Sequence, residues 1–246
     1  MNRQIPSSSA PALPLDAYDR RFYSGMAVVI AVVVFVGFSP SFYLAQRFHR
    51  SVPSPVRIVH GLMFTSWILL FIAQIALITA RRVRWHMRLG VAGAMLAAGM
   101  VGIGSFLAVL AAREGHGAPG VDPRVFMVVP LFDMVLFAAL VGSAVYLRRR
   151  PQAHKRLMLL ATVNLLGAAA ARLPRGYHIS GSPILYGFIV VDMLVLVGVL
   201  YDLATRHRVH PAYLWGGLLI FVSEPLRLAL GGTDVWLAIA NVLVGR

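Results

Sequence analysis

Cysteine is absent from this chain of 246 residues, and acidic residues are few, with nine aspartates and glutamates against 23 lysines and arginines. The absence of cysteine excludes disulfides, thiolate nucleophiles, iron–sulfur clusters and covalently attached c-type haem. Lys155 is the only lysine and falls in a predicted loop, which argues against a retinal-type lysine within a helix. The sequence also contains no nucleotide-binding loop and no Ser-His-Asp arrangement. Proteins that depend on these groups are therefore excluded.

Long apolar runs dominate what is present. The chain is 59% hydrophobic and 13% charged, with a mean hydropathy of +0.75, whereas soluble domains are about half apolar and a quarter charged. Continuous apolar runs, long enough to cross about 30 Å of hydrocarbon, predict an all-α polytopic membrane bundle of about seven helices. We expect a flexible or interfacial leader (1–23), a transmembrane domain (24–231) and a short interfacial or re-entrant segment (232–246). The predicted spans are 24–46, 57–80, 88–112, 125–147, 156–173, 183–204 and 212–231.

The positive charge lies mostly in the loops between these spans. The N-terminal segment and loops 81–88, 148–156 and 206–208 carry 14 lysines and arginines, against seven in loops 47–57, 113–124 and 172–175. The positive-inside rule therefore predicts that the N-terminus is inside. This distribution favours anionic lipid headgroups as partners and argues against nucleic acid. Arginine outnumbers lysine 22 to one, which is typical of GC-rich bacterial genomes, so we expect a multi-pass protein of the bacterial inner membrane.

Three predicted helices begin on the same side of the membrane with a histidine. Segments 133–158 and 192–214 each start with Asp-Met, pass a basic loop and reach a histidine, and segment 74–90 has the same form with Gln74 in place of aspartate. Such recurrence indicates possible hairpin repeats. The helix macrodipole and nearby arginines favour neutral imidazole, the form that binds a metal. These histidines are either ordinary interfacial residues or ligands of a transition metal: His86, His154 and His210.

Polar residues within the spans predict an interior site. His60, Trp67 and Gln74 are seven residues apart, so they share one helix face, which should point into the bundle. Glu224 and Arg227 are one turn apart and are expected to pair. The remaining charges suggest either structural ion pairs or a polar cavity open to the outer face, lined by His60, Asp133, Asp192, Glu224, Arg227 and Arg172, with Gln74 nearby.

A ridge of small residues follows one face of the third predicted helix, at positions Gly90, Ala94, Ala98 and Gly102, with Gly93 and Ala97 beside it. Small residues at every fourth position allow helices to approach closely. The ridge therefore indicates either close helix packing or a flat surface for a planar cofactor.

Histidines near helix ends at both membrane faces resemble di-haem b-type membrane cytochromes and ferric-reductase-like bundles. The H-x-R-L-G and H-K-R-L-M helix starts are also similar to those of uncharacterised bacterial multi-pass membrane proteins, some linked to haem or oxidase biogenesis. The resemblance implies haem b, with His178 or His49 completing an outer pair. The implied cofactor-binding residues are His60, His86, His154 and His210 as axial ligands, Trp67 beside them, and Arg88 and Arg156 as propionate partners.

Three functions fit these observations. The first is a redox protein that binds haem or a metal through helix-end histidines and exchanges electrons with a quinone or another redox partner. The second is a non-redox carrier or assembly factor whose outward-facing polar cavity takes a small or lipidic ligand. The third, a metal-dependent membrane hydrolase or hydroxylase, would need clustered histidines, and His207 and His210 are the only closely spaced pair. The first hypothesis is preferred.

Overall fold

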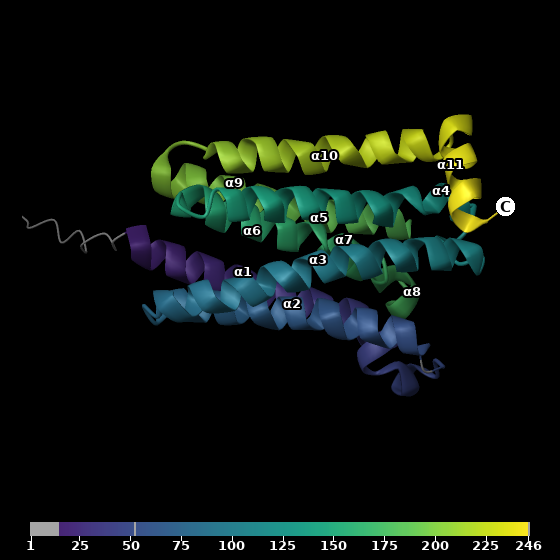
Figure 1. Ribbon diagram of the computed structural model, residues 1–246, viewed down its shortest axis with the longest axis horizontal. Helices are drawn as coiled ribbons and strands as arrows, with labels where there is room; N and C mark the ends of the chain where they lie inside the picture. The colour runs from purple at the N-terminus through teal and green to yellow at the C-terminus, as the bar shows by residue number, and fades with distance from the viewer. Residues whose placement is uncertain (1–14, 52, 246) are drawn as a thin grey trace, which may run out of the picture.

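The protein forms a bundle of long helices that run side by side, as Figure 1 shows for the computed structural model. The structure describes residues 15–51 and 53–245, and every regular element within them is helical. The predicted all-helical membrane bundle is thus confirmed. The long helices are α1 (Leu15–Phe38), α2 (Pro55–Thr79), α3 (Val83–Arg113), α5 (Val128–Tyr146), α9 (Pro183–Arg206) and α10 (Pro211–Gly231).

Short elements complete the chain. A π-helical turn (η1, Ser39–Tyr43) and a 3₁₀ turn (η2, Ala45–Phe48) follow α1, and α4 (Pro123–Phe126) precedes α5. The remaining short helices are α6 (Pro151–Asn164), α7 (Leu166–Ala170), α8 (Leu173–Tyr177) and α11 (Asp234–Val244). Proline at the first position of α2, α4, α6, α9 and α10 fixes these helix starts, because it is preorganised for a helix and its missing N–H would have no partner there.

Six helices in the described part of the chain are long and apolar enough to cross a membrane. The predicted span 156–173 is the exception, because it is divided between α6 and α7 with a break at Leu165. Nearly every α6 residue from Arg156 to Asn164 is buried. A helix that is buried on all sides lies in the centre of a bundle. The fifth predicted span is therefore a helical segment inside the bundle, but not one continuous membrane-spanning helix.

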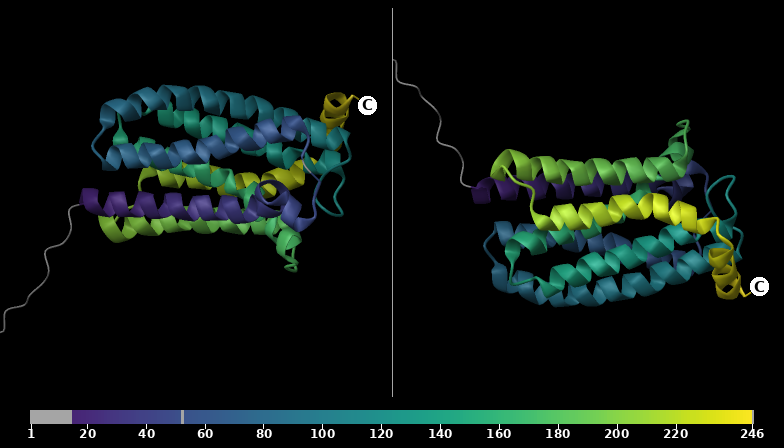
Figure 2. Two further views of the ribbon diagram at one scale, coloured as in Figure 1. Left: turned by 90° about the horizontal axis from the view of Figure 1, so that it is seen from below. Right: turned by 90° about the horizontal axis from the view of Figure 1, so that it is seen from above.

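The first helix starts earlier than predicted, whereas α10 ends at Gly231, the predicted C-terminal boundary of the domain. Helix α1 begins at Leu15 rather than at residue 24, and Asp19 and Tyr23 are buried although they fall in the predicted leader. Residues 1–14 of that leader lie outside the described residues. At the other end, α11 turns across the end of the bundle (Figure 2) and buries Trp236 against α4.

Small residues allow the interior helices to approach closely. A Cβ atom on Gly37 would lie 2.4 Å from the Ala169 carbonyl oxygen, and one on Gly187 would lie 2.9 Å from the Gly167 carbonyl oxygen. These contacts bring α1 and α9 against α7. The predicted ridge on α3 does not pack against another helix, because Ala94, Ala98 and Gly102 are exposed. The small residues beside it, Gly93 and Ala97, are the ones that are buried.

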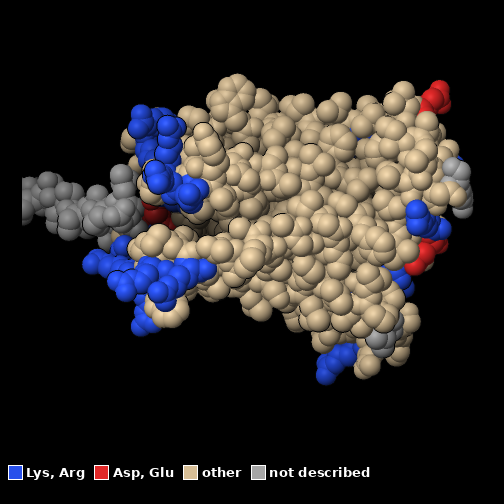
Figure 3. Space-filling model, in the orientation of Figure 1, with Lys and Arg blue, Asp and Glu red and all other residues tan. Residues whose placement is uncertain are grey.

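Lysine and arginine gather at one end of the bundle (Figure 3). We call this the basic end; it comprises the start of α1 and the turns 80–82, 147–150 and 207–210. The opposite end comprises residues 44–51, 53–54, 114–122 and 171–182 together with α11. The predicted first-turn histidines of α3, α6 and α10 all lie at the basic end. That the basic end faces the cytoplasm remains a prediction.

Candidate functional site

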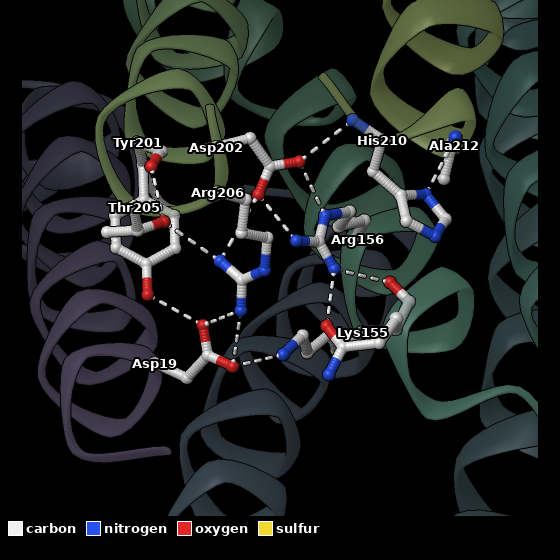
Figure 4. A network of polar contacts seen from close by, with 10 residues as sticks. Asp19, Lys155, Arg156, Tyr201, Asp202, Thr205, Arg206, His210 and Ala212 are labelled. Carbon is white, nitrogen blue, oxygen red and sulfur yellow. Dashed lines mark hydrogen bonds and ion pairs between the residues drawn. The ribbon is translucent and has the colours of Figure 1, made fainter. Parts of the chain in front are cut away.

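A network of buried charges joins four helices at the basic end (Figure 4). Its first centre is the Asp19 carboxylate on α1. Arg206 of α9 donates to both Asp19 oxygens, at 2.7 and 2.9 Å, Lys155 of α6 lies 2.5 Å from Oδ2, and the Tyr201 hydroxyl donates to Oδ1 at 2.6 Å. The carboxylate therefore holds the start of α1 against α6 and α9.

The second centre is an ion pair between Arg156 and Asp202, whose side chains are both 0% exposed. Arg156 Nε and Nη2 donate to the two Asp202 oxygens at 2.8 and 2.5 Å. Arg156 Nη1 donates to the backbone and side-chain oxygens of Gln152 at 2.7 and 2.9 Å, and the His210 backbone N–H donates to Asp202 at 3.1 Å. Charge-assisted bidentate bonds of this kind are the strong ones. Arg156 is thus committed to Asp202 and Gln152, which corrects its predicted role as a propionate partner.

Two of the three predicted histidines lie in edge-to-face contact at the basic end. The rings of His86 on α3 and His154 on α6 have centroids 6.2 Å apart, and their planes are perpendicular, at 88°. His154 Nδ1 lies 2.8 Å from the Ala144 carbonyl oxygen of α5. Since that oxygen can only accept, Nδ1 carries a proton, and Nε2 is the ring nitrogen that can bind a metal when the ring is neutral.

His86 has no such partner. Its Nδ1 atom is buried without a hydrogen bond of normal geometry, close to the Gln74 backbone, and the Gln74 side-chain oxygen is likewise buried and unpaired. Gly90 follows His86 by one helical turn, and a Cβ there would meet only Gln74 Nε2 within 4 Å, at 3.6 Å. Buried polar atoms are usually paired, so this corner of the bundle offers unused hydrogen-bonding groups.

His210 caps a helix and does not meet the other two histidines. Its Nδ1 accepts the Ala212 backbone N–H at 3.0 Å and thereby caps the N-terminus of α10. Burial lowers the pKa of this imidazole, and only the neutral ring can accept with Nδ1. Among the described residues, no group of three or more His, Asp or Glu side chains is arranged to hold a metal ion. The predicted centre of His86, His154 and His210 is therefore not formed.

The charges predicted to line an outer cavity are only partly brought together. Arg227 of α10 pairs with Asp133 of α5 at 2.6 Å, which corrects the expected Glu224–Arg227 pair. Glu224 is 6% exposed and lies near the Asp192 carboxyl of α9.

Other polar groups complete this cluster. Ser223 accepts an Arg227 N–H at 2.7 Å, and Asn164 donates to the Asp133 backbone oxygen at 3.0 Å. Arg172 is instead exposed in the turn before α8, where its guanidinium stacks on Phe38 at 4.5 Å. The groups that meet are thus an ion pair and a carboxyl pair, packed between α5, α6, α9 and α10.

The predicted polar stripe on α2 faces the interior. Trp67 is 2% exposed and its Nε1 donates to Thr162 at 3.3 Å, which makes it a packing residue. His60 stacks on Phe64 with centroids 4.2 Å apart, and its Nδ1 is buried without a partner. Arg88, the other predicted propionate partner, is exposed and lies over the Trp85 ring.

The two aspartates of the network at the basic end were not identified from the sequence. Asp202 precedes Arg206 by one helical turn, and Asp19 stands in the segment interpreted as a leader. The i,i+4 spacing of Asp202 and Arg206 was the available signal, although the main partner of Asp202 comes from α6.

In comparisons with known protein families, curated proteins and solved structures, no match to this chain was found.

Proposed function

We propose that this chain is a membrane haem protein in which His86 and His154 are the two axial ligands of one b-type haem at the basic end. The close approach of these two imidazoles from different helices is the observation that carries the proposal. The absence of cysteine from the sequence restricts a haem to non-covalent binding.

The distance between the rings suits two ligands of one iron. Imidazole nitrogens bind first-row metals at about 2.0–2.1 Å, so two rings on opposite sides of one ion have centroids about 6 Å apart. The observed separation is 6.2 Å. His154 donates its Nδ1–H to the Ala144 carbonyl, the arrangement that orients a histidine whose Nε2 binds a metal. A haem requires only two protein ligands, so the lack of a three-residue metal group does not oppose it.

The surroundings provide further support. The Nδ1 atom of His86 is buried without a hydrogen-bond partner, and Gly90 leaves space beside it on the same helix face. Arg88 and arginines 148–150 are exposed at the same end and carry charge suited to propionates. The proposed site is therefore bordered by exposed positive charge at the basic end.

The chain's own residues would hold and orient the group. A bound haem would supply reversible one-electron chemistry. Arg156 follows His154 by two residues, and its buried bonds to Asp202 fix the first turn of α6 against α9 and α10. Arg156 and Asp202 are thus positioning residues for His154. We further propose a location in the bacterial inner membrane with the basic end inside, and a quinone or a redox partner protein as the electron partner.

A non-redox carrier or assembly factor is the second candidate. The neighbouring carboxyls of Glu224 and Asp192 favour it, because the Arg227 guanidinium forms its ion pair with Asp133 and not with either of them. Ionisable groups within a membrane usually mark a pathway or binding site. In this case the basic-end histidines would be structural and the purified protein would lack haem.

The proposal is tested by the haem content of purified variants. His86→Gln and His154→Gln should each lower haem per protein by at least about tenfold. Loss of a group that only hydrogen-bonds to a metal ligand already costs about 10–100-fold in metal affinity. His116→Gln, an exposed histidine at the opposite end, is the control and should keep its haem. If all three variants behave alike at equal expression and folding, the assignment of ligands is wrong.

A further inference from the structure

An apolar groove lies between α1 and α2 near the basic end, with a volume of about 740 Å³. Its walls include Ser24, Val28, Val32, Phe35, Ile72 and Ala76. Four alanines line the groove on the two helices, so short side chains leave the space open. The volume is within the range of about 300–1,000 Å³ that is typical of small-molecule sites. The groove faces outward, since Val28 and Val32 are 63% and 54% exposed.

Polar and charged groups occur only where the groove reaches the basic end. Ser24 and Thr79 are its hydroxyl residues. Arg20 precedes Ser24 by one helical turn, and Arg21 precedes Val28 by two turns, so both share the face of α1 that lines the groove.

The end of α2 adds two more cations. Arg81 and Arg82 directly follow Ala80, the last residue of the groove wall. These two arginines and their counterparts on α1, Arg20 and Arg21, are exposed, and none of the four forms an ion pair with another described residue. We call these residues the arginine rim. An apolar channel that ends at four free cations is complementary to a molecule with an apolar tail and an anionic head.

We propose that this groove is a binding site for an anionic phospholipid. One acyl chain lies between α1 and α2, and the phosphate of the headgroup contacts the arginine rim. A zwitterionic lipid can insert the same acyl chain, but its headgroup has no net charge to bind four arginines, so the site selects anionic lipids. This inference is independent of the proposed haem site, because it involves neither His86 nor His154.

The absence of cysteine allows a direct test. A bimane fluorophore on Val28→Cys reports the lipid in the groove, and one on Met95→Cys reports ordinary bilayer lipid, because Met95 is 66% exposed on α3 outside the groove. Each labelled protein is placed in vesicles of phosphatidylglycerol or phosphatidylcholine with brominated acyl chains, which quench the label on contact. The attraction of an anionic lipid to one such arginine corresponds to about a fivefold preference over a zwitterionic lipid. The Val28 label should therefore favour phosphatidylglycerol by at least about fivefold, and the Met95 label should show a ratio near one.

The arginine rim is then removed in two separate variants, Arg20→Gln/Arg21→Gln and Arg81→Gln/Arg82→Gln. Each variant should lower the ratio of quenching by phosphatidylglycerol to quenching by phosphatidylcholine at Val28. High salt should lower the same ratio in the protein that keeps all four arginines, and this measurement does not depend on the folding of a variant. Inorganic phosphate should have no effect beyond that of sodium chloride at equal ionic strength. Equal quenching by both lipids at Val28 would show that any lipid or a neutral quinone fills the groove, and would overturn the proposal. A preference that survives both arginine changes, or that free phosphate abolishes, would also overturn it.

Discussion

Replacing Asp202 by asparagine would test how the basic end is held together. Asparagine keeps the shape of the side chain but removes its charge, which leaves the Arg156 guanidinium unpaired at 0% exposure. Breaking a buried ion pair by removing one partner costs about 3–5 kcal/mol. For a chain of this size, about 2–4 °C is lost per kcal/mol, so we expect Tm to fall on the order of 10 °C. Thermal unfolding of the protein in detergent, followed by circular dichroism, measures this change.

Two further variants make that test specific. Arg156→Met/Asp202→Leu removes both charges, and apolar pairs of similar volume often replace a buried ion pair at little cost. The double variant should therefore unfold at a higher temperature than Asp202→Asn, with a clear interaction energy between the two positions. Arg149→Gln, an exposed cation at the same end, should change stability by no more than about 0.5 kcal/mol. If Asp202→Asn is as stable as Arg149→Gln, the ion pair does not hold these helices and the argument fails.

Three other predictions concern the remaining polar groups. Asp133→Asn should destabilise the protein by about 3–5 kcal/mol and Glu224→Gln by clearly less, because the buried Arg227 pairs with Asp133; the reverse order of Tm values would restore Glu224 as the partner. His210→Ala should cost about 1 kcal/mol and His210→Asn little, since asparagine also caps helices. Because the pKa of His210 is lowered in the folded protein, the free energy of unfolding should decrease as pH falls below about 6.5, and this decrease should be smaller in His210→Asn; an unchanged pH profile would be inconsistent with the cap. Arg149→Cys should react with an impermeant thiol reagent only after cell lysis and Arg113→Cys before it, whereas the opposite result would invert the predicted topology.

The apolar architecture could be predicted from the sequence because continuous hydrophobic runs leave few alternatives in a membrane. Six of the seven predicted spans correspond to long helices. The break at Leu165 could not be predicted, since hydropathy records apolar length and not helix continuity. Asn164 donates to a carbonyl of α5 next to this break, a tertiary contact that no local pattern contains.

The polar partners were less predictable for the same reason. The spacing of Glu224 and Arg227 favours a pair within α10, but Asp133 of α5 binds the guanidinium instead. Helix-start histidines were placed correctly from the recurring basic turns, yet the sequence could not show that His154 meets His86 while His210 caps α10. Spacing along one helix defines a shared face, whereas partners on other helices depend on the packed bundle.

The visible spectrum of the unaltered protein tests the central proposal most directly. The protein is purified in detergent from cells supplied with haem precursor, and spectra are recorded before and after dithionite reduction, with metal analysis on the same sample. The proposal predicts about one iron per chain, a Soret band that sharpens on reduction, and the electron paramagnetic resonance signal of low-spin, six-coordinate iron with two histidine ligands. A colourless, iron-free protein that stays folded and does not bind added haem would contradict it.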